Sequence, residues 1–187
     1  MRTRRHVSWM APFLMAALLI VALLMMLPGA AAAKGPVTRY EGVVTGPPDY
    51  LDLSGLMTET LSGGRELWTG MRTFEMQYIT DEPKLNGFFT TTLNAIVYPG
   101  GYWDTWGSLG KWTVTDCPGG SWRGDWHGTL TPNGYSTVIG EYYGVGDLAG
   151  LRNHKVYQSR GIWDAETGYW VDHVSGFISG EQESPCG

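Results

Sequence analysis

The sequence predicts an all-β domain, an antiparallel barrel of about eight strands with a β-sandwich as the alternative, behind an N-terminal signal peptide. From residue 62 onward, turn-forming clusters of Gly, Pro, Asn and Asp recur at the spacing of single strands, which is typical of antiparallel meanders. No segment after residue 33 carries a sustained helical stripe of apolar residues. Strands without a helix layer must pack as two sheets or close into a barrel. Glycine alternating with tryptophan favours the barrel, because tightly coiled strands bend at glycine and large rings fill the interior.

Residues 1–33 have the three parts of a secretory signal peptide. Arg2, Arg4 and Arg5 form a basic start, an uncharged apolar run covers residues 10–27, and alanines occupy residues 30–33. Small residues after an apolar run are the pattern that a signal peptidase cleaves. We therefore expect a secreted or extracytoplasmic protein whose single β-barrel domain covers residues 34–187. The alternative is a membrane anchor, because the apolar run is nearly long enough to span a bilayer as an uncleaved helix.

The charge of the remaining domain excludes one class of partner. Removing the signal leaves 154 of the 187 residues, enough for one domain with a sizeable core. Without the three signal arginines, thirteen Lys and Arg fall to ten against eighteen Asp and Glu, and the net charge falls from −5 to −8. An acidic, lysine-poor domain repels phosphate backbones, so no nucleic-acid partner is expected.

The chain has two cysteines, Cys117 and Cys186, and both follow the signal. In an exported protein an even pair of cysteines indicates a disulfide. This bond would join the turn after residue 115 to the C-terminus and hold the last strand in place.

Eight strands are expected, and the alternation of side chains assigns their faces. Their ranges are 37–45, 65–79, 86–98, 102–115, 121–131, 135–145, 154–163 and 169–179. The clearest alternation puts Trp122 and Trp126 on one face of a strand and Arg123, Asp125 and His127 on the other. We expect the tryptophan face to be buried.

The second alternating segment, residues 66–78, places Trp68, Gly70, Phe74, Met76 and Tyr78 on one face of a single strand. Residues 47–60 precede it and fit either one short turn of helix or a loop. The pattern does not separate these two alternatives.

The glycine-rich stretch GEYYGVGDLAG, residues 140–150, raises the question of a phosphate-binding loop. Such a loop needs a strand before it and a helix after it, but the segment that follows is rich in β-type residues. We therefore interpret Gly144 and Gly146 as a kinked strand end and Gly150 as part of a turn.

Residues 120–179 resemble the C-terminal half of the allene oxide cyclase and dirigent β-barrels. Gly144, Gly146, Leu148 and Gly150 fit the glycine stretch that follows a hairpin in that superfamily. The resemblance implies an eight-stranded, allene oxide cyclase-like or calycin-like barrel with an apolar cavity, and it implies a homo-oligomer, since members often assemble. It carries over no catalytic residue, because the earlier strands show no match.

The aromatic residues suggest a function for the barrel. We expect a cavity lined by some of Trp106, Trp112, Trp122, Trp126 and Tyr142, which binds a small apolar molecule. One alternative is an isomerase or cyclase on the same scaffold, with unknown catalytic residues. Another is a carbohydrate-binding or structural surface module that uses exposed rings.

His127 and Asp125 share one strand face, where they form either a base with its orienting carboxylate or an ordinary solvent-facing pair. No His-x-His, His-Glu-x-x-His or Cys-x-x-Cys spacing occurs in the sequence. Neither a metal nor a cofactor is therefore expected.

Overall fold

The computed structural model describes residues 35–187, apart from residues 48, 161, 167, 184–185 and 187. The predicted signal peptide, residues 1–33, lies outside the described residues. Across the described part of the chain, no helix has the length and apolar character that crossing a membrane requires.

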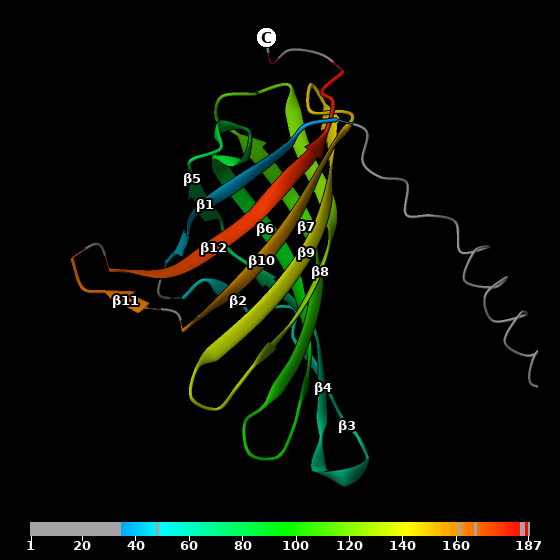
Figure 1. Ribbon diagram of the computed structural model, residues 1–187. Helices are drawn as coiled ribbons and strands as arrows, with labels where there is room; N and C mark the ends of the chain where they lie inside the picture. Colours follow the sequence, from blue (N-terminus) through cyan, green and yellow to red (C-terminus); the bar gives the residue numbers. More distant parts are fainter. Residues whose placement is uncertain (1–34, 48, 161, 167, 184–185, 187) are drawn as a thin grey trace, which may run out of the picture. The chain divides into compact units, whose positions relative to one another are not determined.

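The described domain is a closed antiparallel β-barrel, as the sequence predicts (Figure 1). Eight strand positions close it, because the first strand pairs with the last strand on one side and with the second on the other. In chain order they are β1 (Val37–Gly46), the consecutive pair β4 (Glu66–Thr73) and β5 (Met76–Thr80), β6 (Gly87–Val97), β7 (Trp103–Val114), β8 (Gly120–Leu130), β9 (Tyr135–Gly146), β10 (Leu151–Arg160) and β12 (Tyr169–Gly180).

Three short strands extend the barrel wall. The strands β2 (Leu51–Asp52) and β3 (Met57–Thr60) pair with β4, and β11 (Ile162–Asp164) pairs with β12. The expectation of a helical turn or loop over 47–60 is therefore wrong in part, because this segment adds strands to β4. Two 3-10 turns, η1 (Ser62–Gly64) and η2 (Pro83–Leu85), complete the elements.

The face assignment of β8 is confirmed. Trp122 is fully buried and Trp126 is half-buried, whereas Arg123, Asp125 and His127 are exposed. The alternation therefore holds from Trp122 to His127, and it directs the tryptophans into the barrel.

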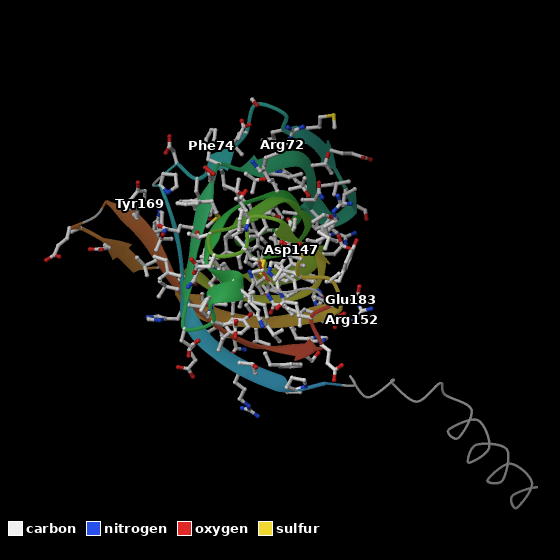
Figure 2. The ribbon with its side chains drawn as sticks, turned by 90° about the horizontal axis from the view of Figure 1, so that it is seen from above. Arg72, Phe74, Asp147, Arg152, Tyr169 and Glu183 are labelled. Carbon is white, nitrogen blue, oxygen red and sulfur yellow. A yellow bond between two sulfur atoms is a disulfide. The ribbon has the colours of Figure 1, made fainter. Side chains whose placement is uncertain are left out.

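The face assignment over residues 66–78 is wrong in part, because the segment is bulged rather than regular. The register with β6 shifts between Trp68 and Met71, and Gly70 between them has a φ of 81°. An extra residue in one strand reverses the alternation, so Met71 is buried instead of Gly70. A second irregularity follows β4, where Phe74 is 48% exposed; Figure 2, which looks along the barrel, shows it at the outer surface.

One end of the barrel is closed by packed turns. The ring N–H groups of Trp112 and Trp122 donate to the backbone carbonyls of Leu85 and Lys84, at 3.2 and 2.9 Å, and so fix the η2 turn over this end. The predicted disulfide between Cys117 and Cys186 is present here, with 4.9 Å between the two Cα atoms. We call this region the closed end; it comprises the η2 turn, Trp112, Trp122, the disulfide and the buried side chain of Leu148.

The glycine stretch ends β9 as the sequence predicts. Gly146 is the last residue of the strand, with a φ of 62°, and a Cβ there would lie 2.1 Å from the carbonyl oxygen of Gly119. Gly144 lies within β9, and Gly150 lies in the turn before β10. The next element is a strand, so the context of a phosphate loop is missing at this position.

Candidate functional site

The barrel contains a cavity of about 550 Å³. The lining extends to Asn133 and Gly134 in the β8–β9 turn, at the end of the strands opposite the closed end. Most lining side chains are apolar or aromatic; they include Val44, Tyr50, Leu51, Met76, Phe89, Leu93, Trp103, Leu109, Trp126, Val138, Tyr142, Tyr157 and Trp170. The volume lies within the range of about 300–1,000 Å³ that is usual for small-molecule sites.

The five aromatic residues expected from the sequence fall into three places. Trp126 and Tyr142 line the cavity. Trp112 and Trp122 are fully buried in the core of the closed end, where they are packed against each other with ring centroids 6.4 Å apart. Trp106 lies on the outer surface, 37% exposed, and does not belong to the lining.

A bulge in β7 explains the difference between Trp106 and Trp112. Phe89 and Thr91 of β6 pair with Trp112 and Leu109, so two steps along β6 match three along β7. The extra residue reverses the alternation of β7. Before the bulge the odd-numbered side chains face inward, and after it the even-numbered ones do.

The ring of Trp126 is held in place by a hydrogen-bond chain that crosses the barrel wall. Its Nε1 donates to Thr91 Oγ1 at 2.6 Å, and the same hydroxyl donates to the backbone carbonyl of Ser108 at 2.8 Å. Because the ring N–H is satisfied inside the wall, the rest of the indole presents apolar surface to the cavity.

The most unusual lining residue is Lys155 of β10, which the sequence analysis missed. Its side chain is about nine-tenths buried, and its Nζ lies 5.3, 5.6 and 5.9 Å from the ring centroids of Tyr78, Tyr142 and Phe89. Among the described residues, Lys155 has neither a hydrogen bond nor an ion pair. The three rings supply cation–π attraction in place of these contacts.

An acidic side chain lines the same cavity. Asp172 of β12 accepts a hydrogen bond from the hydroxyl of Tyr157. Burial is the largest cause that raises the pKa of Tyr157 above its ordinary value, and the negative charge of Asp172 is the second. Burial also lowers the pKa of Lys155 to about 8, an effect that the charge of Asp172 opposes. The apolar cavity therefore contains one amine and one carboxylate, placed by neighbouring strands.

The phase of β10 is the signal that could have revealed Lys155. Leu151, Asn153, Lys155 and Tyr157 alternate with exposed or half-buried residues and all face inward. Leu151 and Tyr157 are typical interior residues, and a lysine in phase with both belongs to the same face. In the sequence, however, a lysine indicates an exposed position, because lysine is almost never fully buried without a partner.

Replacing Lys155 by Met is expected to stabilise the protein at neutral pH by up to about 3 kcal/mol. The fall of the pKa from 10.5 to about 8 means that folding disfavours the charged amine, by about 1.4 kcal/mol for each pH unit. This cost is fully present below pH 8 and disappears as the pH rises toward 10.5. The gain of the variant over the parent protein, measured by urea unfolding, should therefore shrink across that interval.

Lys111→Met is the matched control, since Lys111 is exposed on β7, and it should change stability by at most about 0.5 kcal/mol. A gain for Lys155→Met that is independent of pH between 8 and 10.5 would contradict the burial of a charged amine.

A second depression lies on the outer surface across β7, β8, β9 and β10. It has a volume of about 890 Å³, and its lining includes Trp106, His127, Tyr143 and His154. Of the two alternatives for Asp125 and His127, the solvent-facing pair fits the structure better, because both side chains are exposed and Asp125 accepts a hydrogen bond from Ser108 Oγ at 2.6 Å. His154 Nδ1 lies 3.7 Å from a carboxylate oxygen of Glu141. The lining of this depression contains more polar and charged side chains than the lining of the barrel cavity.

No family model, curated protein or solved structure matches this chain. The resemblance of residues 120–179 to the allene oxide cyclase and dirigent barrels therefore stays a prediction. The cavity and the side chains that line it are the observations that bear on function.

Proposed function

We propose that the barrel binds a small, predominantly apolar molecule in its cavity. The observation that carries this proposal is the apolar and aromatic lining of the 550 Å³ space between the closed end and the β8–β9 turn. An apolar ligand there would exchange water for the apolar wall, and burial stabilises the complex by about 25 cal/mol for each Å² of apolar surface removed from water. The rigid strands provide the walls, so little ordering is needed on binding.

The outer depression supports this function less well. Its rings, Trp106 and Tyr143, are 37% and 46% exposed, and charged or polar side chains such as Asp125, Glu141 and Arg152 surround them. An apolar molecule bound there would keep much of its surface in water. Exposed rings beside polar groups suit a sugar better, so this depression is where a carbohydrate would bind if the surface-module alternative holds.

A role outside the cytoplasm belongs to the same proposal. The disulfide between Cys117 and Cys186 fits an oxidising compartment, where such bonds persist. The basic and apolar N-terminus of the sequence points in the same direction. We propose an exported carrier or sequestering protein for small apolar compounds.

Tryptophan fluorescence can test the binding site. Trp103 and Trp126 line the cavity, so titration with decanol or geraniol should give a saturable change in emission. Trp126→Phe should reduce the size of that change, and Trp106→Phe, on the outer surface, should leave it intact. Recovery of unchanged decanol from the complex separates binding from turnover.

A soluble polysaccharide such as xylan forms the second arm of this experiment. We expect it to leave the emission unchanged. Two results together would overturn the cavity proposal and favour the surface-module alternative. Decanol and geraniol would leave the emission unchanged, and xylan would change it in the parent protein but not in Trp106→Phe.

A further inference from the structure

The proposed function leaves unexplained why an apolar cavity contains a lysine. Resting on that function, we propose that Lys155 is a covalent binding residue for apolar aldehydes, whose carbonyl carbon forms a protonated imine with Nζ in the cavity.

The position of Lys155 supports this chemistry. Its side chain is nine-tenths buried, belongs to the cavity lining, and has no hydrogen-bond or ion-pair partner among the described residues. The lining contains no other lysine or arginine from the described part of the chain. An aldehyde that enters the cavity with its chain against the apolar wall therefore meets a single amine.

Asp172 favours a neutral carbonyl compound over an anionic ligand. Its carboxylate lines the same cavity and accepts from Tyr157, so a carboxylate ligand would bring a second negative charge into an apolar space. An aldehyde brings no charge. The protonated imine keeps the positive charge at Nζ, where Asp172 and the rings of Tyr78, Phe89 and Tyr142 continue to stabilise it.

The reaction needs no oxidant or reductant. The ammonium group first loses one proton, and the neutral amine attacks the carbonyl carbon. An N–C bond forms, the C=O π electrons move to the oxygen, and the oxygen takes a proton from the nitrogen to give a carbinolamine. The hydroxyl then takes up a proton equal to the one that the ammonium group lost, the C–O bond breaks, the oxygen leaves as water, and the nitrogen lone pair forms the C=N bond. In total, one ammonium group and one aldehyde give one protonated imine and one water molecule.

A neutral amine is available in this environment at moderate pH. Burial lowers the pKa of Lys155 to about 8, and desolvation in an apolar pocket is a known way to activate a lysine as a nucleophile. The ionisable groups around it are the hydroxyls of Tyr78, Tyr142 and Tyr157 and the carboxylate of Asp172. Burial raises the pKa of each of these three hydroxyls, so they stay neutral at moderate pH.

Reductive trapping tests the proposal directly. The protein is incubated with decanal and sodium cyanoborohydride near pH 8, and the labelled residue is identified by peptide mapping. We expect one decyl group per chain, with labelling of Lys155 at least about ten-fold above that of the exposed Lys111, because a desolvated lysine is activated as a nucleophile. Lys155→Met should lose the label, and Lys111→Met should keep it.

Decanol and decanoic acid cannot form the imine. Measuring how tightly they bind therefore tests the proposed function independently of this inference. Decanol should bind to the parent protein and to Lys111→Met alike, and a far-UV circular dichroism spectrum of Lys155→Met that matches the parent protein would show that the barrel of this variant is folded. Decanal labelling spread evenly over Lys155, Lys111 and the N-terminal amine would overturn the inference and leave the function standing. Tighter binding of decanoic acid than of decanol, lost in Lys155→Met, would also overturn it. Failure of decanol to bind the parent protein would overturn the function itself.

Discussion

Trp122→Ala is expected to lower the free energy of unfolding by about 3–5 kcal/mol, the usual range for removing a large core ring. Trp122 is fully buried at the closed end and packs against Trp112. Its ring N–H donates to the carbonyl of Lys84 at 2.9 Å, so the substitution also frees the η2 turn. The cavity left behind cannot collapse easily, because the barrel strands around it are paired on both sides.

Urea unfolding monitored by far-UV circular dichroism measures this loss without depending on the tryptophan signal. The control is Asp125→Ala on the exposed face of the same strand, which should cost less than about 1 kcal/mol. Similar losses from both substitutions would contradict the assignment of the two faces of β8.

The second large effect is expected on removing the disulfide by Cys117→Ala together with Cys186→Ala. The two cysteines are 69 residues apart, and the chain-entropy model gives about 4 kcal/mol for a loop of that length. The bond also attaches the C-terminus to the closed end, where Cys117 is buried in the core. Without it, the C-terminal segment after β12 should become more open to exchange and proteolysis.

Thermal unfolding with and without a reducing agent measures the same effect in the parent protein. Reductant should lower the melting temperature of the parent protein and leave that of the double variant unchanged. A double variant as stable as the oxidised parent protein would show that the disulfide does not stabilise this barrel.

Much of the fold could be predicted because strands and turns have short-range signals. Turn clusters placed the strand boundaries within a few residues, and the alternation of β8 gave its buried face. The errors came from bulges. The bulge at Gly70 of β4 and the extra residue of β7 each reverse the alternation within their strand. No local sequence pattern marks the residue at which a bulged strand changes phase.

The candidate site was harder to predict than the fold for a related reason. Aromatic residues are frequent throughout this chain, and only the register of the barrel decides which of them reach the cavity. Trp106 of β7 and Trp126 of β8 are one position apart in the register of these two strands. They therefore lie on opposite faces of the barrel wall, and only Trp126 lines the cavity. Lys155 was missed because its burial depends on three rings that come from other strands.

The proposal that the barrel interior is the binding site is tested most directly by a pair of substitutions at neighbouring positions of β9. Val138 lines the cavity and Ile139 lies on the outer surface, 41% exposed. Val138→Phe places a ring in the space that a ligand would occupy, and Ile139→Phe adds a similar group outside. Decanol affinity, measured by isothermal titration calorimetry, should fall at least about ten-fold in Val138→Phe, or about 1.4 kcal/mol, and stay unchanged in Ile139→Phe. An affinity that falls only in Ile139→Phe would place the ligand on the outer surface and contradict the proposal.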